Sequence, residues 1–80
     1  MKAKFFNNAN RIELFNFPDS NKLNATVLEL NSFLRQCAKQ YTILQKDGRI
    51  NIYTLVGDYN LVAQRLKLEL QYKYGKEYIK

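Results

Sequence analysis

The order of apolar and turn-forming segments repeats along this 80-residue chain, and the repeat limits the folds that it can adopt. A short apolar segment, Lys4–Phe6, is followed by the polar run Asn7–Asn10 and by a strand-like segment that begins at Arg11. The same order recurs later, with a polar turn at Gln45–Gly48 and a strand-like segment that begins at Arg49, 38 positions after Arg11. A helical pattern follows each pair of segments, so the sequence predicts a ββα unit used twice.

The first unit contains two predicted strands, Lys2–Phe6 and Arg11–Phe17, joined by an asparagine-rich turn. Asn suits this turn because its side chain tolerates a positive φ. Pro18 ends the second strand, since proline has no backbone donor for a ladder. Ser20 or Asn24 is the expected N-cap of the helix that follows.

The first helix is predicted to run to about Gln40, and its apolar residues recur every three or four positions. This spacing gives one apolar stripe that faces a core. The stripe consists of Leu23, Val27, Leu30, Leu34 and Cys37, widened by Leu28 and Phe33. Cys37 is the single cysteine in a chain without histidine, so we interpret it as a small buried hydrophobic residue.

The second unit contains predicted strands at Tyr41–Leu44 and Arg49–Leu55 and a predicted helix over about Tyr59–Tyr74. The turn between the strands suits a type I turn followed by Gly48 in the left-handed region. Asp58 is the expected cap of the second helix. The expected core stripe of that helix consists of Tyr59, Val62, Ala63, Leu66 and Leu70. We expect the helix to stop near Gly75 and the tail Lys76–Lys80 to fray.

The ββαββα order predicts an α+β fold, a two-layer sandwich with a four-stranded, mostly antiparallel sheet and two helices on one face. We expect one domain over residues 1–80, with its two units at 1–40 and 41–80. This order is a circular permutation of the ferredoxin-like βαββαβ arrangement, which is a statement about topology alone. An internal duplication and two ordinary hairpin–helix units both explain the repeat.

The second strand of each hairpin is expected at the centre of the sheet. The segments Arg11–Phe17 and Arg49–Leu55 should lie side by side and parallel, with Lys2–Phe6 and Tyr41–Leu44 as the edges. The two units would then be related by a pseudo-two-fold axis.

Alternation along the central strands separates an aliphatic face from an aromatic and basic face. Ile12, Leu14, Ile50 and Ile52 form the aliphatic set and should face the helices. If Gln45 pairs with Arg49 across the turn and Phe5 lies opposite Glu13, the other face also carries Phe5, Tyr41 and Ile43. We expect that face to be open to solvent, because both helices are needed on the aliphatic face. The candidate binding residues on this open face are Lys4, Phe5, Arg11, Phe15, Tyr41, Ile43, Arg49 and Tyr53.

An exposed aromatic face of this kind usually marks an interaction site. One hypothesis is a platform for single-stranded nucleic acid, on which bases stack while cations contact phosphates. The stacking residues would be Phe15, Tyr41 and Tyr53, with Arg11, Arg49 and Lys4 near the phosphates. The alternative is a protein–protein interface, including a homodimer that packs sheet on sheet through the same face.

A second apolar stripe lies opposite the core stripe of the second helix. It contains Leu61, Leu68 and Tyr72, spaced by seven and four positions, with Arg65 beside it. A helix that is apolar on two sides can lie between layers or meet a partner, so we treat this stripe as a candidate partner-binding or self-association face. Scattered surface leucines, which are normal, also explain it.

The composition favours binding over catalysis. The net charge of +6 favours acidic partners such as nucleic acid, although charge also serves solubility. Histidine is absent, the seven carboxylates are dispersed, and the three glycines form no phosphate-binding loop. The sequence therefore predicts no enzyme, no catalytic residue, no cofactor, no metal and no small-molecule substrate.

The beginning of the chain lacks the pattern of a signal peptide, and no apolar run approaches the length of a membrane span. We therefore expect a cytoplasmic protein without a membrane partner, in a reducing compartment that suits one cysteine. The frequent Lys, Asn, Ile and Tyr residues suggest an AT-rich coding sequence. A small protein of a phage or mobile element that binds and modulates a host factor would fit this composition.

Overall fold

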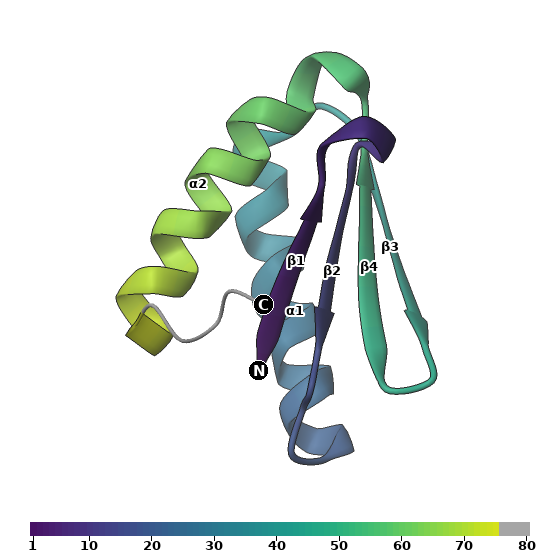
Figure 1. Cartoon of the computed structure of the whole chain (residues 1–80), viewed down its shortest axis with the longest axis vertical. Coiled ribbons are helices and arrows are strands. Elements are labelled where there is room, and N and C mark those ends of the chain that lie inside the picture. The colour runs from purple at the N-terminus through teal and green to yellow at the C-terminus, as the bar shows by residue number, and fades with distance from the viewer. Residues whose placement is uncertain (76–80) are drawn as a thin grey trace.

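The computed structural model describes residues 1–75. Its elements are β1 (Lys2–Phe6), β2 (Arg11–Phe15), α1 (Ser20–Cys37), β3 (Tyr41–Lys46), β4 (Arg49–Thr54) and α2 (Val56–Tyr74), with a short 3-10 helix at Asn7–Ala9. Both helices lie on the same side of the sheet, and no helix formed by residues 1–75 lies on the other side (Figure 1). This arrangement confirms the predicted two-layer α+β fold and its ββαββα order. The prediction for the tail Lys76–Lys80 lies outside the described residues.

The strands are ordered β1-β2-β4-β3, so β2 and β4 are central neighbours as predicted. Their relative direction was predicted wrongly, because they run antiparallel. A two-fold axis perpendicular to a sheet reverses strand direction, so the two-fold relation between the units is itself incompatible with parallel central strands. Glu13 pairs with Asn51, which lies 38 positions later, and the pseudo-two-fold axis therefore passes between equivalent residues.

The core lies between the sheet and the two helices. Ile12, Leu14, Ile50 and Ile52, the aliphatic set of the central strands, have no exposed surface. The predicted α2 stripe is buried in full, at Tyr59, Val62, Ala63, Leu66 and Leu70. The alternation of the central strands and the helical period of α2 therefore predicted the centre of the core correctly.

The buried stripe of α1 differs from its prediction at four positions. Thr26 is buried, and its hydroxyl donates to the Lys22 carbonyl at 2.8 Å, which satisfies the polar group within the helix. Leu28 is 70% exposed and does not widen the stripe, whereas Phe33 packs against the core. Val27 and Cys37 are half-buried at the margin of the stripe.

The helix caps also differ from their predictions. The cap of α1 is Asp19, whose carboxylate accepts from the Lys22 backbone N–H at 2.8 Å, and neither Ser20 nor Asn24. In α2, Asp58 lies within the first turn, where it accepts from the backbone N–H of Lys39 at 3.0 Å. An acidic residue in the first turn stabilises the positive end of the helix dipole as a cap would.

The turn between β3 and β4 contains two residues, Asp47 and Gly48, both at positive φ (55° and 74°). Positive φ at both positions is the geometry of a type I′ turn. Lys46 therefore pairs with Arg49, and the predicted pairing of Gln45 with Arg49 was wrong by one residue. A slip of one residue turns every side chain of a strand to the opposite face.

Replacing Gly48 with alanine is expected to destabilise the fold by about 1 kcal/mol, because an L-residue at this positive φ is strained. A Cβ at this position meets no atom within 4 Å, so the effect is conformational and not a clash. Gly57→Ala, in the first turn of α2 and also in open space, is the matched control and should be neutral or stabilising by up to about 1 kcal/mol. Urea unfolding of both variants measures the difference, and an equal effect at the two glycines would contradict the turn assignment.

Within residues 1–75, neither helix has the length and hydropathy that a membrane crossing requires.

Candidate nucleic-acid interface

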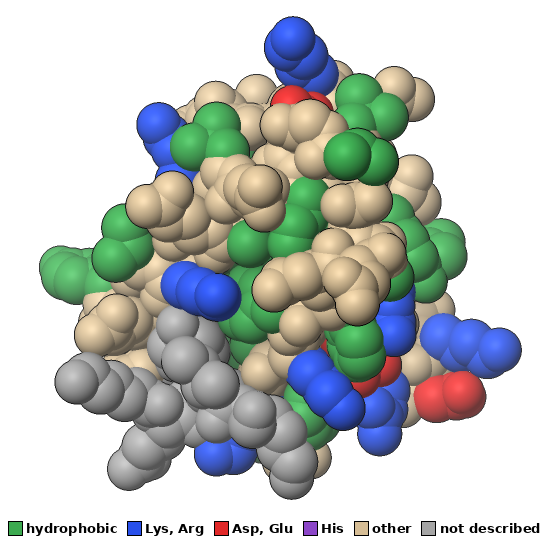
Figure 2. Space-filling model, turned by 45° about the horizontal axis from the view of Figure 1, so that its top comes forward, with side chains coloured by type: hydrophobic (Ala, Val, Ile, Leu, Met, Phe, Trp, Pro, Cys, Tyr) green, Lys and Arg blue, Asp and Glu red, His purple; other side chains and the backbone are tan. Residues whose placement is uncertain are grey.

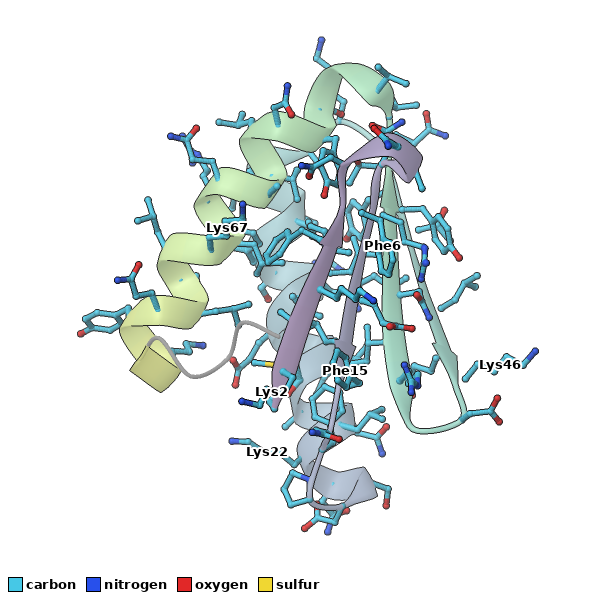
Figure 3. All side chains as sticks on the ribbon, in the orientation of Figure 1. Lys2, Phe6, Phe15, Lys22, Lys46 and Lys67 are labelled. Atoms are coloured by element: carbon cyan, nitrogen blue, oxygen red, sulfur yellow. The ribbon has the colours of Figure 1, made fainter. Side chains whose placement is uncertain are left out.

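The side of the sheet away from the helices forms a continuous surface, which we call the open sheet face. The observed register gives its members from all four strands. They are Lys2, Lys4 and Phe6 of β1, Arg11, Glu13 and Phe15 of β2, Arg49, Asn51 and Tyr53 of β4, and Thr42, Leu44 and Lys46 of β3. Figure 3 shows Phe6 and Phe15 projecting from the sheet on this side, with Lys67 between α2 and β1 on the other.

Five of the eight predicted binding residues lie on the open sheet face: Lys4, Arg11, Phe15, Arg49 and Tyr53. The other three, Phe5, Tyr41 and Ile43, lie on the helix side of the sheet, so their predicted placement was wrong. The cause is the register of the two edge strands. Each is shifted by one residue from its expected pairing, which moves alternate side chains to the opposite face.

Each of the three misplaced residues has contacts on the helix side. Phe5 pairs with Ile12, packs against the core and lies under the Lys67 ammonium, 4.8 Å from the ring centroid. The Tyr41 hydroxyl lies 3.3 Å from the Asn31 carbonyl of α1, to which it donates. These contacts make the three side chains part of the packing between sheet and helices.

The same shift brings onto the open sheet face residues that the sequence interpretation missed. Lys2 and Phe6 of β1 and Leu44 and Lys46 of β3 take the places of the lost aromatic and aliphatic residues. The dipeptide Asp-Gly between two apolar runs is a strong signal for a two-residue hairpin and would have given the correct β3 register.

Arg11 lies against an aromatic ring and a polar neighbour. Its Nη1 donates to Asn51 Oδ1 at 2.6 Å, and its Cζ lies 3.9 Å from the centroid of the Phe6 ring. The Lys4 ammonium lies 5.2 Å from the same centroid. Cation–π contact and the hydrogen bond together hold the Arg11 guanidinium beside Phe6 and Asn51.

The polar contact of Arg11 is repeated at Arg49 about the pseudo-two-fold axis. Its Nη1 donates to Glu13 Oε1 at 3.1 Å, and its Cζ lies 5.3 Å from the centroid of the Phe15 ring. Glu13 and Asn51 are equivalent positions in the two units, as are Arg11 and Arg49. The open sheet face therefore presents two arginines in equivalent polar settings, each beside an aromatic ring, although Phe6 and Phe15 are not equivalent positions in the two units.

The open sheet face is basic. Among the described residues it carries five cationic side chains and one carboxylate, Glu13. The Glu13 side chain is only 14% exposed and lies 3.8 Å from Arg11 and 3.1 Å from Arg49, so the two arginines neutralise it. Figure 2 shows Lys and Arg side chains gathered around hydrophobic ones on the sheet side of the molecule.

The second candidate site, the outer stripe of α2, lies away from the core. Leu61, Leu68 and Tyr72 are 46%, 63% and 89% exposed, and Arg65 is exposed beside them. None of these four residues belongs to the core cluster or to the hydrophobic residues packed against it. The four residues thus share a solvent-facing side of α2, separate from the open sheet face.

The remaining polar chemistry is structural. Burial raises the pKa of the Cys37 thiol. The charge of Arg65 lowers this pKa, but by less than burial raises it, and the charge of Asp58 raises it further. The thiol donates to the Phe33 carbonyl at 3.5 Å. Burial also raises the pKa of Tyr59, whose hydroxyl donates to Asn7 Oδ1 at 2.9 Å. Within residues 1–75, no group of three or more His, Cys, Asp or Glu side chains could hold a metal ion.

Comparisons of the chain with protein-family models, with curated proteins and with solved structures find no significant match, so the geometry of these two surfaces carries the functional argument.

Proposed function

We propose that this chain is a small, non-enzymatic module that binds single-stranded nucleic acid on its open sheet face. The observation that carries the proposal is the composition of that face under the observed register. The predicted residues Phe5, Tyr41 and Ile43 are absent from the open sheet face. The cations Lys2 and Lys46 are present on it. A face with fewer apolar and more cationic side chains is less suited to a dry sheet-on-sheet dimer and better suited to a polyanion.

Aromatic rings and guanidinium planes together favour unpaired bases. Phe6, Phe15 and Tyr53 offer rings, and Arg11 and Arg49 offer planar cations that both stack on bases and contact phosphates. The backbone positions of the two arginines are four residues apart along the central strands, about 13 Å, whereas both guanidinium groups reach the Glu13 carboxylate that lies between them. We infer a nucleic-acid strand that runs along the central β-strands, with both guanidinium groups near the middle of the contact.

A second candidate function is binding of a protein partner, and the specific observation that favours it is the exposed stripe of α2. Leu61, Leu68 and Tyr72 form an apolar surface bordered by Arg65 that the fold itself does not use. In this alternative the protein is a small phage or mobile-element product that binds and modulates a host factor. For either function we propose a cytoplasmic location, supported by the single cysteine, which suits a reducing compartment.

Fluorescence anisotropy with a labelled single-stranded oligonucleotide of about 12 nucleotides tests the nucleic-acid proposal. Binding should weaken steeply with added salt, and the logarithmic slope should be about −0.7 for each phosphate contact, or about −2 to −3.5 in total. The duplex of the same sequence should bind more weakly because its bases are not free to stack. Undetectable binding, or binding that does not change with salt, would contradict the proposal.

A pair of double variants separates the open sheet face from overall charge. Lys4→Gln/Lys46→Gln removes two cations from the face and should reduce the magnitude of the salt slope by about 1.4. Arg35→Gln/Lys39→Gln removes two exposed cations at the end of α1 and after it, and should leave the slope unchanged. Equal effects of the two double variants would show that net charge alone drives binding.

A further inference from the structure

The strand β3 forms one edge of the sheet, with no described strand on its outer side. Thr54 donates its backbone N–H to the Asn10 carbonyl at 3.2 Å, so the even-numbered residues of β4 bond toward β2. The odd-numbered residues of β4 therefore bond toward β3, and their partners there are Thr42, Leu44 and Lys46. The alternation leaves the backbone N–H and C=O groups of three other β3 residues directed outward. These residues are Tyr41, Ile43 and Gln45.

The two edges of the sheet differ in how they are protected. In β1 the outward-directed residues Ala3 and Phe5 lie on the helix side, where Phe5 lies under Lys67 of α2, and the strand also carries Lys2 and Lys4. Charged residues and a covering element are common protections of an edge strand. In β3, Tyr41 likewise contacts a helix, through its hydrogen bond to Asn31 of α1, so the difference lies in the charges. The single lysine of β3 is Lys46 at the turn, and the rest of the strand contains no proline, glycine or charge.

The sequence of β3 favours strand pairing. Tyr, Thr and Ile are residues with high β-propensity, and the strand is six residues long. A long, exposed edge without protective residues is a template for pairing with another strand.

We propose that β3 pairs with β3 of a second copy of this chain, antiparallel, about a two-fold axis at Ile43. The outward-directed residues then form the hydrogen-bonded pairs, with Ile43 opposite Ile43 and Tyr41 opposite Gln45. Thr42 and Leu44 lie opposite each other between these pairs, and no two like charges within the strand are opposed. Two four-stranded sheets become one sheet of eight strands.

The surface around β3 is self-complementary, which is why we assign the edge to a second copy. Leu44, 52% exposed, would lie opposite Thr42 of the second copy. The two Leu44 side chains would be diagonal neighbours across the axis, about 7–8 Å apart, within reach of each other. Tyr53, 39% exposed, pairs with Thr42 in the same chain and extends this apolar contact on both sides.

The dimer leaves both open sheet faces uncovered and pointing in the same direction, because a two-fold axis perpendicular to the sheet preserves the facing of each side. The two faces join into one continuous surface about 35–40 Å across. This dimer forms through the edge of the sheet, whereas a sheet-on-sheet homodimer would bury the open sheet face. The edge dimer can therefore form whether or not the open sheet face binds nucleic acid.

Sedimentation equilibrium tests the proposal. The native chain should move from 9.5 kDa toward twice that mass as its concentration rises, and should not exceed two chains. Leu44→Lys should weaken the dimer at least about tenfold, since it places two cations across the axis and removes the leucine contact. The same change at exposed leucines elsewhere, Leu28→Lys on α1 and Leu68→Lys on α2, should leave the dimer intact. A chain that stays at 9.5 kDa at all concentrations, one that assembles beyond two copies, or a dimer lost in Leu68→Lys and kept in Leu44→Lys would each overturn the proposal.

Amide hydrogen exchange gives a second measurement that does not depend on a variant. The amides of Ile43 and Gln45 should exchange more slowly as the dimer forms, whereas those of Thr42 and Leu44 should be protected at every concentration. Slowing confined to amides of α2 would contradict the β3 interface. The dimer is measured on the native chain without any oligonucleotide, so a failed dimer test is distinguishable from a failed binding test.

Discussion

Replacing Arg11 and Arg49 together with glutamine is expected to weaken the binding of a single-stranded oligonucleotide by about a hundredfold at constant salt. Each substitution removes both a charge-assisted contact with a phosphate and a planar surface on which a base can stack. A hundredfold corresponds to about 2.7 kcal/mol, just below the roughly 3–6 kcal/mol that two hydrogen bonds to charged groups contribute together. Anisotropy titrations of the native and variant proteins in the same buffer measure the change.

The lysine version of this double variant separates charge from stacking. Arg11→Lys/Arg49→Lys keeps the net charge of +6, so the salt slope should stay the same. Affinity should still fall several-fold, because lysine is a point charge that offers no planar group to a base. Circular dichroism checks that both variants are folded. Full affinity in the glutamine variant would contradict binding at the open sheet face. Full affinity in the lysine variant would contradict only the stacking of bases on the guanidinium groups.

Leu14→Ala is expected to reduce the free energy of unfolding by about 3 kcal/mol. Leu14 has no exposed surface and pairs with Ile50 across the two central strands, so its truncation leaves a cavity where the two ββα units meet. A domain of 80 residues has a total stability of only about 4–12 kcal/mol, so this one change removes a large fraction of it.

Urea unfolding followed by circular dichroism and by tyrosine fluorescence measures the loss. The two signals should change together in one transition that shifts to lower urea, because both units contribute to a single core. Leu28→Ala is the matched control, since Leu28 is 70% exposed and its truncation should change stability by less than about 0.5 kcal/mol. Two separate transitions in Leu14→Ala would contradict a shared core.

Long periodic patterns made the fold predictable from the sequence. The α2 stripe from Tyr59 to Leu70 repeats every three or four residues, and the aliphatic positions of β2 and β4 alternate strictly, so the core follows from burial alone. The direction of the central strands did not follow from such patterns, because alternation is the same in parallel and antiparallel pairs. The antiparallel direction follows from the two-fold axis that relates Glu13 to Asn51, because such an axis perpendicular to the sheet reverses the direction of a strand.

The candidate site was harder to predict because it depends on register. One residue of difference in the length of the turn at Asp47 and Gly48 decided whether Tyr41 and Ile43 or Leu44 and Lys46 faced solvent. The central strands have no such freedom, since a slip there would bury charged side chains. For that reason Arg11, Phe15, Arg49 and Tyr53 were placed correctly, and the edge strands were not.

The most direct test of the open sheet face is an NMR titration of the native protein with the single-stranded oligonucleotide. The account predicts that the largest chemical-shift changes occur at Phe6, Arg11, Phe15, Arg49 and Tyr53, with small changes at Leu61, Leu68 and Tyr72 on α2. Changes confined to the outer side of α2, with the sheet residues unaffected, would contradict it.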